Sequence, residues 1–250
     1  MASNPKRALI LYSYANVGEH GKTPAVDALC QRGCGGQLML ERRPDSEHKE
    51  KGNERRQDII QLLGLSGCSS IEQMKAQLTE RFRSMKLGLI ASCPSITALG
   101  DSLGLTIASS SSSSATKDIY SKEHLQAAID RVDVLLVDVS DQPSEMDRIM
   151  TEVLESTSDL LKCIVMHATV QKQQQENMPL QSGVTKNGVP VDILERLVCA
   201  YWHDGSTRRD RVRGFTVQDI VANGCNGSIL AWHYLAEIGH KLGHVPKYGA

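Results

Sequence analysis

Aromatic side chains are scarce, at 4% of the 250 residues, so we expect a core built mainly from aliphatic side chains. No apolar run approaches the ~20 residues that cross a bilayer, and we therefore expect no membrane span. The formal net charge is -1, so no overall field draws the chain to nucleic acid or to a membrane surface. The residues before Ala8 lack the apolar core of a signal peptide, and we expect no secretory leader.

The cysteines also lack the spacing of a disulfide framework. Seven of them are scattered along the chain, their number is odd, and no Cys-x-x-Cys pair occurs. Cys30 and Cys34 lie about one helical turn apart and, without further ligands, are expected to be packing residues. The pattern predicts reduced thiols, and hence a cytoplasmic or other reducing intracellular compartment.

Short apolar runs alternate with segments of helical periodicity over the whole chain. The runs expected to be buried strands are 8–12, 87–91, 132–139 and 163–166, and the expected helices are 24–32, 58–65, 71–85, 94–103, 121–131 and 144–160. Residues 192–200 fit a helix or a strand equally well. This alternation predicts an α/β fold, a three-layer sandwich with a largely parallel central sheet. We expect one domain over 1–250, with flexible loops at about 41–57, 106–118 and 171–188.

The C-terminal segment has the features of a complete, packed helix. Apolar residues recur at helical spacing over 229–242, Asn226 or Ser228 can cap the start, and Gly243 can end it. We expect its apolar face to pack on the sheet and Trp232 to be largely buried, since large aromatic side chains supply much contact area.

Several of these segments resemble one known family when they are taken in order. They are Gly21-Lys22-Thr23-Pro24, the strand 132–139, and the terminal run Arg213 to Ala250. The chain resembles the archaeal-type cofactor-independent phosphoglycerate mutases of the alkaline phosphatase superfamily. The resemblance implies an alkaline-phosphatase-like core, two divalent metals such as manganese, and a serine nucleophile that interconverts 2- and 3-phosphoglycerate.

The chain departs from this family at the positions that carry the chemistry. Tyr12-Ser13 stands where the first metal-binding aspartate is expected, and no serine lies at the nucleophile position before Leu62. No histidine follows Asp141 at the expected spacing, and little of the inserted cap domain can fit. The resemblance therefore implies a short, cap-less pseudoenzyme without a metal or other cofactor, which acts as a binding, scaffold or assembly subunit with a protein partner or in an oligomer.

A second hypothesis keeps catalysis in a rearranged site. Asp138 and Asp141 flank the end of the clearest strand, where open α/β sheets place their ligands. With His167 and His203 they could hold manganese or another divalent metal for a mutase or phosphatase reaction. The simpler interpretation of each residue is structural: a helix-capping aspartate or a hydrogen-bonded loop histidine.

A cluster of basic residues precedes the terminal segment. It consists of Arg208, Arg209, Arg211 and Arg213. Such a cluster could bind the phosphate of a small phosphorylated molecule. The alternative is a solvated face whose arginines pair with the nearby acids Asp204, Asp210 and Asp219.

Overall fold

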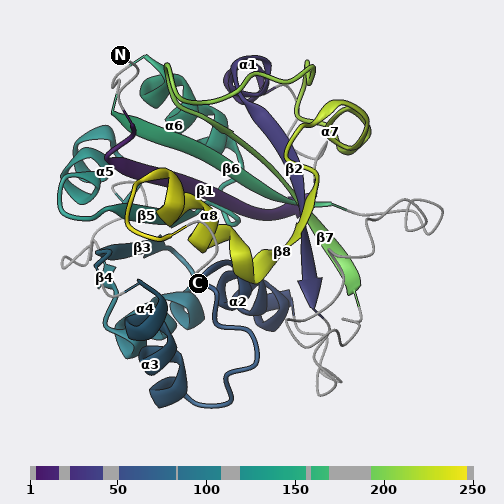
Figure 1. The fold of residues 1–250 in the computed structure, drawn as a ribbon. Helices are drawn as coiled ribbons and strands as arrows, with labels where there is room; N and C mark the ends of the chain where they lie inside the picture. The colour runs from purple at the N-terminus through teal and green to yellow at the C-terminus, as the bar shows by residue number, and fades with distance from the viewer. Residues whose placement is uncertain are drawn as a thin grey trace.

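The computed structural model describes residues 4–16, 23–41, 51–82, 84–107, 119–155, 159–168 and 193–246. One sheet runs through this part of the chain, with eight strands in the order β4-β3-β5-β1-β6-β7-β2-β8 (Figure 1). The strands are β1 (Arg7–Asn16), β2 (Cys34–Glu41), β3 (Leu87–Ala91), β4 (Thr106–Ile107), β5 (Val134–Asp138), β6 (Leu160–Ala168), β7 (Ile193–Trp202) and β8 (Ser228–Leu230). Only β7 runs antiparallel to its neighbours, β6 and β2. The predicted α/β fold with a largely parallel sheet is confirmed.

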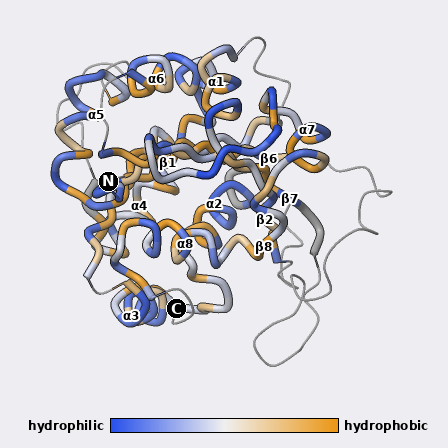
Figure 2. The backbone as a smooth tube through the Cα atoms, turned by 45° about the horizontal axis from the view of Figure 1, so that its top comes forward, coloured by the Kyte–Doolittle hydropathy of each residue, from blue (hydrophilic) through white to orange (hydrophobic). Residues whose placement is uncertain are grey.

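Helices cover both faces of this sheet and complete the three predicted layers. One layer contains α2 (Lys51–Leu62), α3 (Ile71–Phe82), α4 (Pro94–Leu103) and α8 (Tyr234–Lys241), and the other contains α1 (Pro24–Arg32), α5 (Lys122–Ile129), α6 (Ser144–Leu154) and α7 (Val217–Asn223). Strand β1 shows the division: Ile10 and Tyr12 pack with the first layer, whereas Leu9 and Leu11 pack with the second. Figure 2 shows hydrophobic residues along the central strands, between the two helical layers.

Three elements differ from the sequence-based expectation: β2, the start of α2, and β4. Strand β2 was not predicted, because Gly35 and Gly36 leave only a short apolar stretch; pairing with β7 along its whole length makes it a strand. The predicted loop 41–57 ends earlier than expected, since α2 already begins at Lys51. Within the predicted loop 106–118, Thr106–Ile107 forms β4 and 108–118 lies outside the described residues, as does 171–188. Residues 193–202 form strand β7, which settles the undecided segment.

The C-terminal segment packs as predicted but is not one continuous helix. It begins as β8, which pairs with β2 from Ser228 onward, continues through the 3-10 helix η3 (Ala231–His233), and ends as α8. Leu235 and Ile238 are buried, at 2% and 0% exposure, as expected for the face on the sheet. Trp232 is only half-buried, which corrects its predicted burial, because it lies in η3 outside the α8 stripe. Gly243 follows α8 with a φ of 82°, a left-handed conformation that suits glycine and ends the helix.

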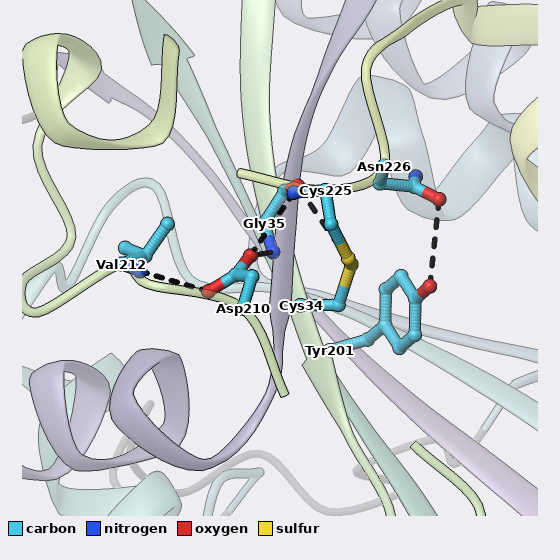
Figure 3. Close-up of a disulfide and its surroundings, with 7 residues drawn as sticks. All are labelled: Cys34, Gly35, Tyr201, Asp210, Val212, Cys225 and Asn226. Atoms are coloured by element: carbon cyan, nitrogen blue, oxygen red, sulfur yellow. Dashed lines mark hydrogen bonds between the residues drawn. A yellow bond between two sulfur atoms is a disulfide. The ribbon is translucent and has the colours of Figure 1, made fainter. Parts of the chain in front are cut away.

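A disulfide joins Cys34 at the start of β2 to Cys225 after α7 (Figure 3). This finding corrects the prediction that every cysteine is a reduced thiol. Glycine makes the contact geometrically feasible: a Cβ on Gly224 would lie 2.6 Å from the carbonyl oxygen of Gly35. The expectation of a reducing compartment rested on the absence of disulfides and therefore loses that support. As expected from hydropathy, the described helices include none with the length and apolar character of a membrane span.

Candidate functional site

A group of polar side chains lies at the carboxyl-terminal edge of the sheet. Asp138 is the last residue of β5 and pairs with Tyr12 on β1 and with Ala91 on β3. Because these three strands are parallel, their carboxyl-terminal ends point to the same edge, and Asp141 follows within the next turn. This edge is where open α/β sheets commonly bind their ligands, and we treat it as the candidate site.

Arg55 of α2 reaches across this edge and binds both aspartates. Its Nε and Nη2 atoms lie 2.6 Å and 2.5 Å from Asp138 Oδ2. Its Nη1 and Nη2 atoms donate to the two oxygens of Asp141, over 2.7 Å and 3.1 Å. The side chains of Arg55 and Asp138 are 8% and 0% exposed, whereas that of Asp141 is 48% exposed. The guanidinium group thus lies between a buried carboxylate and a half-exposed one.

Two serines complete the hydrogen bonding of both carboxylates. Asp138 Oδ1 accepts from the backbone N–H of Ser140 at 3.0 Å and from its hydroxyl at 2.5 Å. Asp141 Oδ2 accepts from the hydroxyl of Ser92 at 2.5 Å. All four carboxylate oxygens therefore have donors within the protein, and we call these five residues (Arg55, Asp138, Asp141, Ser92 and Ser140) the Arg55 cluster.

Burial and the ion pairs shift the pKa values of the Arg55 cluster in opposite directions. Burial raises the pKa of Asp138, although the guanidinium and the Ser140 donors act against this shift. The hydrogen bond from Arg55 holds the pKa of Asp141 below its usual value. Burial disfavours the charge of Arg55, but its hydrogen bonds to Asp141 and its attraction to Asp138 prevail and raise its pKa. The arginine is therefore a permanent cation.

Two tyrosines of β1 attach α2 to the same edge. Tyr12 is fully buried, and its hydroxyl donates to Asp58 Oδ2 at 2.7 Å. The hydroxyl of Tyr14 donates to Glu54 Oε2 at 2.5 Å. Burial and the neighbouring Asp58 raise the pKa of Tyr12, so it stays a neutral donor. These bonds hold the turn of α2 that carries Arg55 against the strand ends.

The four residues proposed for a rearranged site do not all meet. Asp138 and Asp141 lie together, and His167 lies on β6 at the same edge, with its ring 4.9 Å from that of Tyr14. His203 follows β7, whose last residue Trp202 pairs with Lys162 at the start of β6. Five residues of strand, about 17 Å, separate that level from His167. The predicted site that combines all four residues is therefore wrong in one member. His203 lies at the opposite edge, where its ring contacts the Ser206 hydroxyl in a turn.

The sequence does not single out Arg55 as a site residue, because it falls in the predicted flexible loop 41–57. A signal was present, because Arg55, Asp58, Ile59 and Leu62 are spaced by three, four and seven residues, as on one helical face. All four are buried in the structure. Charged residues in phase with the aliphatic residues that follow indicate a helix face that buries charged side chains together with their partners elsewhere in the fold.

The Arg55 cluster does not fit the two divalent metals that the family resemblance implies. Its carboxylate oxygens already accept from a guanidinium and from serines, and a cation would have to displace a buried positive charge. Within the described ranges, the one group of three ligand-type side chains close enough to share an ion is Cys34, Asp210 and Cys225. That group lies elsewhere, and its two sulfurs form the disulfide.

Comparison with known proteins supports the fold. No family model matches the sequence, and no curated protein matches it. Among solved structures, the PH0037 protein from Pyrococcus horikoshii matches with a TM-score of 0.62 and 12% identity, over 100% of both chains. A cofactor-independent phosphoglycerate mutase from Thermoplasma acidophilum matches with a TM-score of 0.53 and 9% identity, over 96% of this chain and 100% of that one.

A third match extends the same result. A protein in the alkaline phosphatase superfamily from Vibrio parahaemolyticus matches with a TM-score of 0.52 and 11% identity, over 98% of this chain and 68% of that one. At these identities the likeness concerns the fold. The chain therefore has an alkaline-phosphatase-like α/β fold, similar to that of a cofactor-independent phosphoglycerate mutase.

Proposed function

We propose that this protein is a phosphoglycerate-mutase-like chain that has given up metal-dependent phosphoryl transfer and now acts as a binding or assembly subunit. The observation that carries the proposal is the position of the Arg55 guanidinium, 2.5 Å from the buried carboxylate of Asp138. In this fold, that carboxylate is the best placed of the candidates for a metal ligand, because it ends a central strand.

A divalent metal and the Arg55 guanidinium would compete for the same carboxylate lone pairs. Two-metal phosphoryl transfer needs several anionic or imidazole ligands that converge on each ion. A divalent cation at Asp138 and Asp141 would meet the permanent positive charge of Arg55 at hydrogen-bonding distance. The cluster instead resembles a structural ion pair, which ties α2 to β5 and completes the hydrogen bonds of both aspartates.

Metal content and mutase activity test this proposal together. The purified chain is dialysed against manganese, measured by elemental analysis, and assayed for conversion between 2- and 3-phosphoglycerate. The Thermoplasma acidophilum mutase is the positive control. We expect no stoichiometric manganese and no conversion above the protein-free blank.

The matched variants are Arg55→Met, which removes the competing charge, and Asp138→Asn, which removes the carboxylate. Manganese-dependent conversion by the wild-type chain that disappears in Asp138→Asn would overturn the proposal. It would favour the alternative, an active metal-dependent mutase or phosphatase built on Asp138 and Asp141. Circular dichroism melts of both variants show whether a lost signal reflects unfolding.

A further inference from the structure

The loop that follows β7 forms an open hollow far from the Arg55 cluster. The hollow has a volume of about 690 Å³, and its walls include Arg209, Arg211 and Arg213, together with Gln31 of α1 and Asn223 of α7. We call these five residues the arginine hollow. Because the loop starts where β7 ends, beside the start of β6, the hollow belongs to the opposite edge of the sheet from Asp138.

The acids that the structure describes beside the arginine hollow hydrogen-bond to the backbone and form no close ion pair with its guanidinium groups. Asp210 Oδ2 accepts from the backbone N–H groups of Gly35 and Cys225, and its Oδ1 accepts from that of Val212 (Figure 3). Asp219 likewise accepts from the backbone N–H groups of Arg213 and Gly214.

No carboxylate in the described part of the chain lies within 4.0 Å of the three guanidinium groups. Among the lining residues, three guanidinium groups face one carboxylate, so a surplus of positive charge remains. Contrary to the alternative interpretation, Asp210 and Asp219 therefore do not pair directly with these arginines: both carboxylates hydrogen-bond to the backbone, although Asp219 still attracts Arg213 at longer range.

The backbone that carries these arginines is firmly anchored. The N–H of Asp210 donates to the carbonyl of Gly33 at 3.0 Å, and the side chain of Val212 is buried at 3% exposure. The N–H of Phe215 donates to Asp27 Oδ1 at 2.7 Å. The Cys34–Cys225 disulfide joins the two segments that donate to Asp210. A ligand therefore has only the arginine side chains to order, which lowers the entropic cost of binding.

We propose that the arginine hollow binds a small phosphorylated molecule, a phosphate ester or diphosphate with two or more negative charges. Guanidinium groups donate two parallel hydrogen bonds to phosphate oxygens, and three arginines line this space. The volume lies in the range of ~300–1,000 Å³ typical of small-ligand sites. The formal charge of the whole chain is -1, so no overall field draws it to nucleic acid, and the surplus of positive charge is local to the hollow.

Calorimetric titration of the full chain with pyrophosphate and with inorganic phosphate, at low ionic strength, tests the proposal. We expect saturable binding that is tighter for pyrophosphate, because it offers more negative charge to the three arginines. Arg211→Gln should weaken binding about tenfold, as expected for one lost charge-assisted hydrogen-bonded contact. The triple variant R209Q/R211Q/R213Q should abolish it.

Arg208 supplies the matched control, since it is exposed in the same loop but does not line the hollow. Arg208→Gln removes the same charge and should change the affinity less than about threefold, as is usual for an exposed charge near a site. All substituted arginines are exposed, so thermal melts should be unchanged.

The proposal is overturned if neither probe binds the wild-type chain saturably, or if Arg208→Gln weakens binding as much as Arg211→Gln does. The second result would mean a diffuse attraction to basic surface. Neither result depends on manganese or on phosphoglycerate conversion, so this site stands or falls separately from the function proposed above.

Discussion

Arg55 and Asp138 are 83 positions apart in the sequence, yet the Nε of the arginine lies 2.6 Å from Oδ2 of the aspartate in the interior of the protein. This pair joins the middle of α2 to the last residue of β5. It lies at the edge where open α/β sheets commonly bind a ligand, and the protein's own guanidinium lies beside the carboxylate there.

Removal of the cation should destabilise the protein strongly. Arg55→Ala leaves the buried carboxylate of Asp138 without its counter-charge, and breaking a buried pair from one side costs about 3–5 kcal/mol. Urea unfolding followed by circular dichroism measures the change in the free energy of unfolding. Arg56→Ala is the control, because Arg56 is only half-buried and should cost less than about 1 kcal/mol.

The double variant Arg55→Met/Asp138→Leu separates the effect of charge on stability from the effect of packing. Replacement of both partners by apolar residues of similar size removes the uncompensated charge, so much of the lost stability should return. Equal stability of Arg55→Ala and Arg56→Ala would contradict the burial of this ion pair.

The contribution of Asp141 should depend on pH. Its hydrogen bond from Arg55 lowers its pKa from the usual 3.8, so it stabilises the folded state above that value and loses the effect as the pH falls through the folded-state pKa. The difference in unfolding free energy between wild type and Asp141→Asn should thus be full at neutral pH and shrink below about pH 4. The raised pKa of Asp138 acts in the opposite direction, but it is present in both proteins and largely cancels. The same difference at pH 7 and pH 3 would show that Asp141 carries no such pair.

The disulfide should contribute measurably to stability. It joins residues 191 positions apart, and closing so long a loop restricts the unfolded chain, which predicts a loss of about 2–5 kcal/mol in Cys225→Ser. Cys93→Ser is the control, since Cys93 is a half-exposed thiol. A thiol titration of the unfolded, unreduced protein should find five reactive groups of the seven cysteines. Seven reactive thiols would mean that the bond does not form.

The C-terminal helix should be part of the folding unit. Ile238→Ala removes a fully buried side chain of α8 and should cost about 2–5 kcal/mol, while Glu237→Ala on the exposed side should stay within about 0.5 kcal/mol. Deletion of 226–250 should give an insoluble or molten chain, because it removes strand β8 from the sheet and helix α8 from the layer that covers it. A soluble truncated protein with an unchanged, cooperative melt would show that this segment is an appendage.

Local sequence signals were sufficient to predict much of the fold. The helices Pro24–Arg32 and Pro94–Leu103 and the strand Leu87–Ala91 have the bounds expected from sequence. Each helix begins with proline and is followed by glycine, and the strand is a bounded apolar run. These features act within a few neighbouring residues, so no knowledge of distant contacts is needed.

Distant contacts decide the rest, and they explain the errors. Gly35 and Gly36 favour a turn locally, but a full ladder with β7 makes them strand. Ser228–Leu230 continues a helical pattern, yet pairing with β2 makes it β8. Arg55 is hydrophilic by type, and only its partners on β5 and in the following turn make its burial favourable. The candidate site is built from such contacts, which is why it was recognised less well than the fold.

The disulfide also changes what a cut in the backbone can do. The covalent ring closed by Cys34 and Cys225 contains every element from β2 to α7. A protease that cleaves one peptide bond anywhere inside this ring leaves two fragments that stay linked through sulfur. The nicked protein would migrate as two bands on a reducing gel and as a single species without reductant, and its halves could not diffuse apart or be exchanged between molecules.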